Sequence, residues 1–135
     1  MSIAKVRMAM EKRLATMSPA LATAYENVTF SPVVGTPYQR INMLQAAPAD
    51  LVKGRTLTEL SGLMQVTLFY PQGTGPAAAE ARAELIKAHF KPPMTLTEGA
   101  VNVHVNNTAR VATGFPDGDR YAVPVSIPWI AYITN

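Results

Sequence analysis

Apolar residues recur every three or four positions near the N-terminus, a spacing that is typical of a helix with one buried face. The members of this stripe are Ile3, Val6, Met10, Leu14 and Met17. Ser2 can cap the start of the helix. Ser18-Pro19 favours its end, because the residue before a proline avoids the helical conformation. The pattern therefore predicts an amphipathic helix over residues 2–17.

A different period follows, in which apolar and polar residues alternate as they do in a half-buried strand. The segments that we expect to be strands in this part are 27–30, 38–45 and 63–70. Gly62 interrupts the apolar pattern of residues 55–70, and we expect it to divide that stretch. Residues 38–70 therefore predict a hairpin, and its connecting arm, residues 46–61, is too long for a tight turn.

The second half of the chain begins with a turn-forming run, Pro71-Gln72-Gly73-Thr74-Gly75-Pro76. An alanine-rich helix is predicted over residues 77–90, with Pro76 suited to its first turn. Its expected buried stripe is Ala78, Ala81, Leu85 and Phe90, and its expected solvent-facing residues are Glu80, Arg82, Glu84 and Lys87. Strands are expected over residues 96–106, 109–113 and 120–134, with a hairpin turn at 115–119. This order predicts one α+β domain, residues 1–135, with a mostly antiparallel or mixed β-sheet and two α-helices packed on one face.

The last of these strands carries two prolines on the same face. Pro124 and Pro128 cannot donate hydrogen bonds to a sheet, so they favour an edge strand. Trp129 lies on the opposite face with the valines of the strand. Two interpretations remain open: an ordinary core strand with a protected edge, or an edge whose aromatic end meets a neighbouring subunit.

Composition narrows the chemistry that is available. The chain is 48% hydrophobic and 16% charged, which is enough apolar sequence for a core. It has no cysteine and two histidines, which excludes disulfides, thiolate metal sites and a cysteine nucleophile. His89 is expected to complement the end of a helix, and His104 to face solvent or an interface. No nucleotide-binding or zinc motif is present, so we expect neither enzymatic activity nor a cofactor or metal.

The charge pattern adds little to this picture. Twelve Lys and Arg residues against nine Asp and Glu residues give a net charge of +3. No run of five like charges indicates a nucleic-acid-binding tail. No apolar run approaches the roughly 20 residues of a membrane span, so no membrane partner is expected.

Four segments together resemble a known family. They are LATMSPALATAYENVTFSP, GTPYQRINMLQAAP, GLMQVTLFYPQGTGPAAAEARAELIKAHF and RYAVPVSIPW. In their order along the chain they are similar to the tail terminator-like, or tail completion, proteins of long-tailed bacteriophages. The most specific part is the central strand, its YPQGTG turn and the alanine-rich helix that follows.

The resemblance implies a structural protein of a phage or prophage. Its subunits would form a ring, expected to be a hexamer, that caps the head-proximal end of the tail tube. Such a ring ends tube polymerisation and provides the surface that joins the head. The implied partners are further copies of the chain, the tail tube protein and a head–tail connector protein, with DNA only as cargo passing through the lumen. The implied location is the virion tail, after assembly in the host cytoplasm.

The alternatives are another head–tail connector or neck protein, a small soluble enzyme, and a monomeric binding module. The resemblance assigns no residues to contacts, so the interface residues are our own hypotheses. We expect the arm, with Lys53 and Arg55, to contact a neighbouring subunit or the tail tube. Arg40 is expected to add positive charge near the lumen, with a surface ion pair as its simpler role. Pro124, Pro128 and Trp129 are expected at a subunit contact, with Trp129 partly buried there.

Overall fold

The computed structural model describes residues 2–50 and 57–134, so Lys53 and Arg55 lie outside the described residues. Its helices are α1 (Ser2–Ala15) and α2 (Ala77–His89). Its strands are β1 (Ala22–Ala24), β2 (Tyr38–Gln45), β3 (Ala49–Asp50), β4 (Leu57–Pro71), β5 (Met94–Glu98), β6 (Val101–Val105), β7 (Arg110–Val111), β8 (Phe115–Asp117) and β9 (Arg120–Thr134). The predicted strand over 38–45 is confirmed at both ends, and both predicted helices form.

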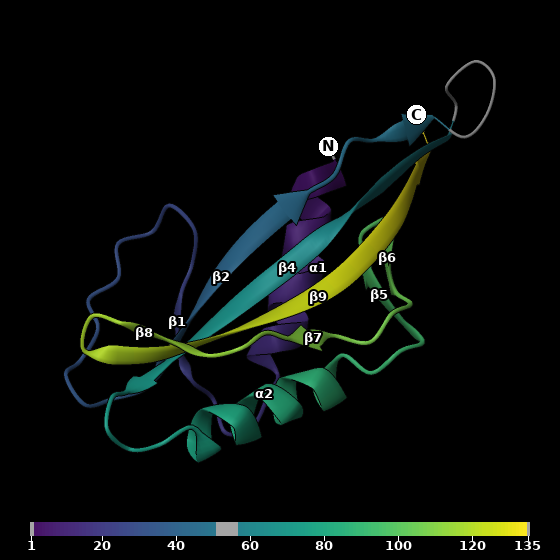
Figure 1. The fold of residues 1–135 in the computed structure, drawn as a ribbon. Helices are drawn as coiled ribbons and strands as arrows, with labels where there is room; N and C mark the ends of the chain where they lie inside the picture. Colours follow the sequence, from purple (N-terminus) through teal and green to yellow (C-terminus); the bar gives the residue numbers. More distant parts are fainter. Residues whose placement is uncertain (1, 51–56, 135) are drawn as a thin grey trace.

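The strands form a single twisted sheet in the order β1-β2-β4-β9-β6-β5 (Figure 1). Short strand β3 pairs with β4, and β7 and β8 pair with β9. Among the described strands, β1 and β2 run parallel and the other pairs are antiparallel. The central pair, β4 and β9, stays in register from Leu57 opposite Thr134 to Pro71 opposite Arg120. The predicted hairpin of residues 38–70 is confirmed as the β2–β4 pair.

Both helices cover the same face of the sheet, and α1 lies behind the strands in Figure 1. One core contains the inward side chains of the central strands and of both helices. Its fully buried members include Val6, Met10, Met64, Val66, Ile86, Phe90, Val125 and Ile127. The stripe predicted for the first helix is confirmed, because large apolar residues at helical spacing leave one face to bury. The chain therefore has the predicted α+β fold.

Three predictions about the strands are wrong. Residues 26–27 form a turn, with Asn27 at a φ of +57°, and the short strand lies earlier, at β1. Asparagine tolerates this left-handed conformation, which ends a strand. Residues 96–106 are two strands, β5 and β6, joined by a turn at Gly99, which has a φ of +60°. The prediction that Gly62 divides its segment is also wrong, because β4 runs through Gly62 without a break.

The buried stripe predicted for α2 is also wrong, apart from Phe90. Ala79, Arg82, Ala83 and Ile86 are buried, whereas Leu85 is exposed. Alanines lie on two neighbouring stripes of this helix, so the alanine spacing does not select one of them. Arg82 is buried because its Nη1 donates a hydrogen bond to the Pro19 carbonyl at 2.6 Å. Burial lowers the pKa of Arg82 from its usual value.

The predicted edge position of the last strand is wrong, because β9 lies inside the sheet with partners on both sides. In an antiparallel strand the N–H and C=O of one residue point to the same side. The Pro124 carbonyl accepts a hydrogen bond from Ala112 on the β7 side, so its missing N–H does not interrupt the ladder to β4. Pro128, four residues on, faces the same side. It falls between the residues that pair with β7 and those that pair with β6.

Candidate interaction surface

The long central strands extend past the body of the fold as a projecting ribbon (Figure 1). Its described residues are β3, the start of β4 and the end of β9, with Ala49 opposite Glu59 and Glu59 opposite Tyr132. The described parts of the arm, residues 46–61, lie in this ribbon beside the end of β9. Tyr132, near its tip, is 43% exposed. The arm is therefore available for contact with another molecule.

The face of the sheet opposite the helices carries a mixture of polar and apolar side chains. On β2, β4 and β9 these are Arg40, Asn42, Leu44, Leu63, Gln65, Thr67, Pro124, Ser126, Pro128 and Ile130, all partly or fully exposed. At the far end from the arm this face is closed by Phe30, whose ring lies 5.0 Å from that of Tyr38. Pro124 and Pro128 thus lie on an open surface, and their role in a subunit contact remains a prediction.

Arg40 lies on this open face and is exposed. Its guanidinium carbon is 5.9 Å from the ring centroid of Phe69, a cation–π distance. It also borders a hollow of about 480 Å³ between β2 and residues 24–30. Arg40 forms no ion pair with any other described residue, so the surface ion pair is not found there. Its expected place near a DNA lumen stays a prediction.

Trp129 lies on the helix-covered face and is 3% exposed, within the core of its own chain. It stands opposite Gly62 in the β4–β9 pair. Its indole Nε1 is buried and has no hydrogen-bond partner among the described residues. Buried donors are nearly always paired in native proteins, so this one is unusual. Whether Trp129 also takes part in a subunit contact stays a prediction.

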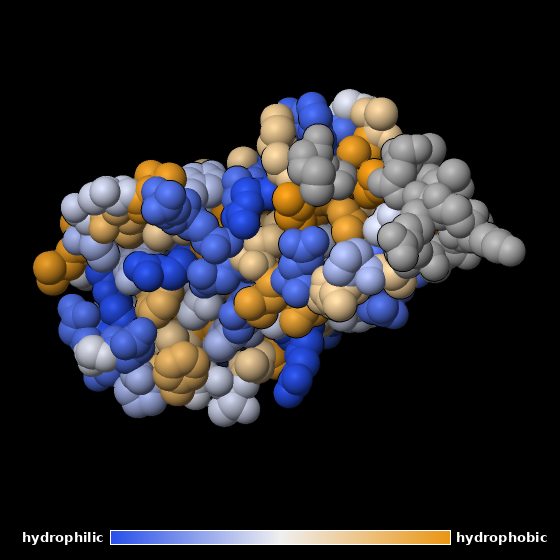
Figure 2. All heavy atoms as spheres, turned by 90° about the horizontal axis from the view of Figure 1, so that it is seen from above, coloured by the Kyte–Doolittle hydropathy of each residue, from blue (hydrophilic) through white to orange (hydrophobic). Residues whose placement is uncertain are grey.

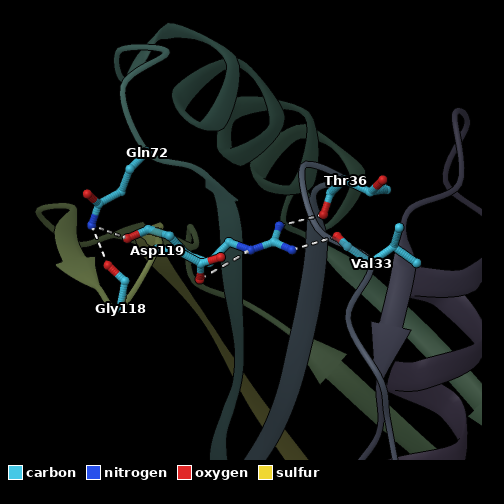
Figure 3. A network of polar contacts seen from close by, with 6 residues as sticks. Val33, Thr36, Gln72, Gly118 and Asp119 are labelled. Carbon is cyan, nitrogen blue, oxygen red and sulfur yellow. Dashed lines mark hydrogen bonds and ion pairs between the residues drawn. The ribbon is translucent and has the colours of Figure 1, made fainter.

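The loop of residues 25–37 is fixed to the sheet at both of its ends. At its start, Glu26 accepts hydrogen bonds from Arg7 at 2.8 Å and from the Met43 backbone at 2.6 Å. These bonds hold the pKa of Glu26 below its usual value. Near its end, the carbonyls of Val33 and Thr36 point toward the Arg120 guanidinium (Figure 3). The loop is therefore a fixed part of the surface.

Arg120 is the centre of this attachment and is 6% exposed. Its Nη2 donates to the Val33 carbonyl at 2.7 Å, its Nη1 donates to the Thr36 carbonyl, and its guanidinium carbon lies 5.1 Å from the Tyr38 ring centroid. The backbone around it is held in turn by Gln72, whose side chain donates to the Gly118 carbonyl at 2.8 Å (Figure 3). The buried Arg120 guanidinium thus holds this loop to the sheet, as backbone hydrogen bonds would hold a strand.

The loop presents two valines to solvent. The Thr36 N–H donates to the Val33 carbonyl at 3.1 Å, and Gly35 has a φ of +80°, which together close a tight turn. Val33 is 66% exposed and Val34 is 87% exposed. Figure 2 shows hydrophobic residues among hydrophilic ones at this end of the molecule. We call residues 33–36 the valine turn.

Replacing Arg120 with alanine is expected to lower the free energy of unfolding by about 2 kcal/mol, because two hydrogen bonds from a charged donor are lost. Urea unfolding measures this change. The matched control is Arg110→Ala on the neighbouring strand β7, where the side chain is exposed and a change below about 0.5 kcal/mol is expected. Equal effects of the two substitutions would contradict the role of Arg120 in holding the loop to the sheet.

The histidines have structural partners. His89 Nε2 lies 2.7 Å from the Arg13 carbonyl and 2.8 Å from Thr16 Oγ1, which joins the ends of the two helices. His104 Nδ1 lies 3.1 Å from Thr95 Oγ1 across the β5–β6 pair. Within residues 2–50 and 57–134, no cluster of three or more His, Asp or Glu residues could hold a metal ion. The helices of this part are too short or too polar to cross a membrane.

The exposed features of this fold are three surfaces: the arm, the open sheet face and the valine turn. Residues 5–129 match the family model described as phage tail terminator protein, and the chain belongs to this family. It is therefore a structural protein of the bacteriophage tail. Seven solved chains are similar to it. One of them is 26% identical to this chain, with a TM-score of 0.79 over 100% of this chain and 99% of that one. No curated protein matches.

Proposed function

We propose that this chain forms a closed ring on the head-proximal end of the phage tail tube. The ring occupies the growing end, stops further addition of tube subunits and offers a new surface to the head. The observation that carries this proposal is the family match over residues 5–129. The partners are other copies of the chain, the tube protein and a head–tail connector protein, with DNA passing through the lumen.

A ring of identical subunits closes only if each subunit meets one condition. Each subunit must carry two different surfaces that fit each other, so that rotation by a fixed angle closes the assembly. The chain offers distinct surfaces at separate places: the arm, the open sheet face and the valine turn. We propose that the chain acts as one domain over residues 1–135 and assembles as a hexamer. Assembly takes place in the host cytoplasm, and the ring then remains in the virion tail.

Deleting Ala49 to Thr58 is expected to abolish ring formation and tail capping while the body of the fold remains. Ala49 lies opposite Glu59, so the two ends that the deletion joins are already close. Leu60, the first core residue of β4, is retained. Electron microscopy of tails would then show tubes of uncontrolled length, because nothing stops subunit addition.

The thermal unfolding of the deletion variant provides the control. A cooperative transition shows that the body has folded, so a capping defect then belongs to the arm. Tails of normal, uniform length assembled with this variant would refute the role of the arm. Rings formed by the variant that fail to bind tubes would assign the arm to the tube contact rather than to the subunit contact.

A further inference from the structure

The open face of the sheet carries a row of polar side chains that crosses four strands in register. Asn42 of β2 lies opposite Gln65 of β4. Gln65 in turn lies opposite Ser126 of β9, and Ser126 lies opposite Arg110 of β7. Arg40, two residues before Asn42, is on the same face of β2. We call these five residues the polar row; strand spacings of about 4.8 Å place its two arginines about 16 Å apart.

The polar row is not used by the fold of the described residues. Its two arginines are exposed, and its other three side chains are partly exposed. Apart from the contact of Arg40 with the Phe69 ring, none of the five side chains forms a hydrogen bond or an ion pair with another described residue. Guanidinium, amide and hydroxyl groups all donate hydrogen bonds. The row can therefore offer several donors to one extended ligand.

The surface around the row carries positive charge and no carboxylate. Strand segments 38–44, 63–69 and 122–130, which form this part of the sheet, contain no Asp or Glu. Glu59 on the arm and Asp117 on β8 lie beyond these segments. Glu26, which lies near the edge of β2, accepts hydrogen bonds from Arg7 and from the Met43 backbone. The polar row therefore favours an anionic ligand.

The cations of α1 differ from the arginines of the row, because they have acidic partners. Arg7 Nη1 lies 2.8 Å from Glu26 Oε1 and 3.6 Å from Glu11 Oε2. Lys12 Nζ lies 2.8 Å from Glu98 Oε1. These carboxylates offset the positive charge of the helix surface. The arginines of the row have no ion pair among the described residues, so their charge is available to a ligand.

The shape of the face indicates which anion it fits. Arg, Asn, Gln and Ser side chains are among those that contact the phosphate and sugar oxygens of DNA. Reading of bases requires an element that enters a groove, such as a helix. The helices of this chain lie on the other face of the sheet (Figure 1). The row therefore suits the backbone of a DNA duplex and does not select its sequence.

We propose that the polar row contacts the phosphate backbone of DNA, and that the open face of the sheet accordingly lines the lumen of the ring. The inference rests on the proposed ring and names the face of each subunit that the passing DNA meets. Two arginines per subunit make the contact weak and dependent on salt, because affinity comes from displaced counterions. Backbone contacts of this kind let DNA slide, which a passage for a genome requires.

Engineered cysteines test the position of the face, because the natural chain has none. Thr67→Cys places a thiol opposite Arg40 on the open face, and Ala88→Cys places one on the exposed side of α2. In tails assembled without heads, Thr67→Cys should react with a small maleimide but not with a maleimide coupled to a globular protein, which cannot enter the lumen. Ala88→Cys should react with both reagents. In the free chain, both variants should react with both.

A second measurement tests the contact with DNA. Fluorescence anisotropy of a labelled DNA duplex gives the affinity of the purified chain at several salt concentrations. The double variant Arg40→Gln, Arg110→Gln should reduce the slope of log affinity against log salt concentration by about 2, one for each lost phosphate contact. The matched control, Lys5→Gln, Lys12→Gln, removes the same charge from exposed residues of α1 and should leave the slope unchanged.

The outcomes separate the inferred face from the ring itself. In capped tails, a Thr67→Cys thiol that reacts with the protein-coupled maleimide lies outside the lumen, and one that reacts with neither reagent lies in a contact between proteins. Either result overturns the inference and leaves the proposed function standing. Equal slopes for the two double variants, or no DNA binding by the natural chain at low salt, overturn the DNA contact. Tails that the natural chain fails to cap refute the proposed function instead.

Discussion

Replacing Trp129 with alanine is expected to lower the free energy of unfolding by about 4 kcal/mol, the typical loss for a large aromatic residue removed from a core. Trp129 is 3% exposed and packs in the core that both helices share with the sheet. Its removal leaves a cavity between the central strands and the helix layer. A loss of about 4 kcal/mol exceeds one quarter of the free energy of unfolding of a typical domain. The variant should therefore be partly unfolded well below the melting temperature of the natural chain.

The matched control is Tyr132→Ala, an aromatic residue three positions along the same strand. Tyr132 is 43% exposed on the open face, so its loss should change the free energy of unfolding by less than about 1 kcal/mol. Urea unfolding of the monomeric form measures both. A Trp129→Ala variant as stable as the natural chain would show that Trp129 is not a core residue.

Replacing Gly62 with alanine is expected to lower the free energy of unfolding by about 3 kcal/mol, through overpacking. A Cβ at this position would collide with the backbone oxygen of Leu44 and would lie 3.0 Å from a ring carbon of Trp129. The Leu44 oxygen belongs to the backbone of β2, so relief requires a shift of the strand itself. Glycine is thus required in β4 by the close approach of its neighbours, and not by a turn.

Gly118→Ala separates this steric effect from the effect of backbone conformation. Gly118 has a φ of +61°, and a Cβ there would meet no atom within 4 Å. Its replacement should cost about 1 kcal/mol from conformation alone. Thermal unfolding should therefore rank Gly62→Ala well below Gly118→Ala in stability. The reverse order would mean that β2 and β4 adjust freely at Gly62.

The sequence predicts elements whose pattern comes from large apolar residues. The first helix and β2 are of this kind, since one face of each carries residues that must be buried. It does not predict which face of α2 is buried, because alanines provide similar surfaces on two sides and Arg82 finds its partner only in the folded chain. The sequence does not predict the interior position of β9 either, for a related reason. Whether a proline fits inside a sheet depends on the side of the strand to which the N–H that proline lacks would have pointed.

The valine turn shows the limit of sequence reasoning for the candidate surface. Two valines between Pro32 and Pro37 are visible in the sequence, but their fixed exposure depends on Arg120, 87 residues away from Val33. Nothing in the sequence next to Val33 or next to Arg120 indicates that a hydrogen bond joins them. The arm, in contrast, could be predicted, because a connection of that length inside a hairpin is uncommon.

The pairing of β4 with β9 has a consequence for how the protein is made. These strands form the longest ladder of the sheet, yet residues 72–119 separate them in the chain. Pairing over such a separation is slow, because loop closure must come before the contacts that stabilise it. β9 follows every other described element, so during synthesis β4 lacks its main partner until these last strand residues have left the ribosome. The surfaces that β4 and β9 share therefore form late in folding, only once these two strands have paired.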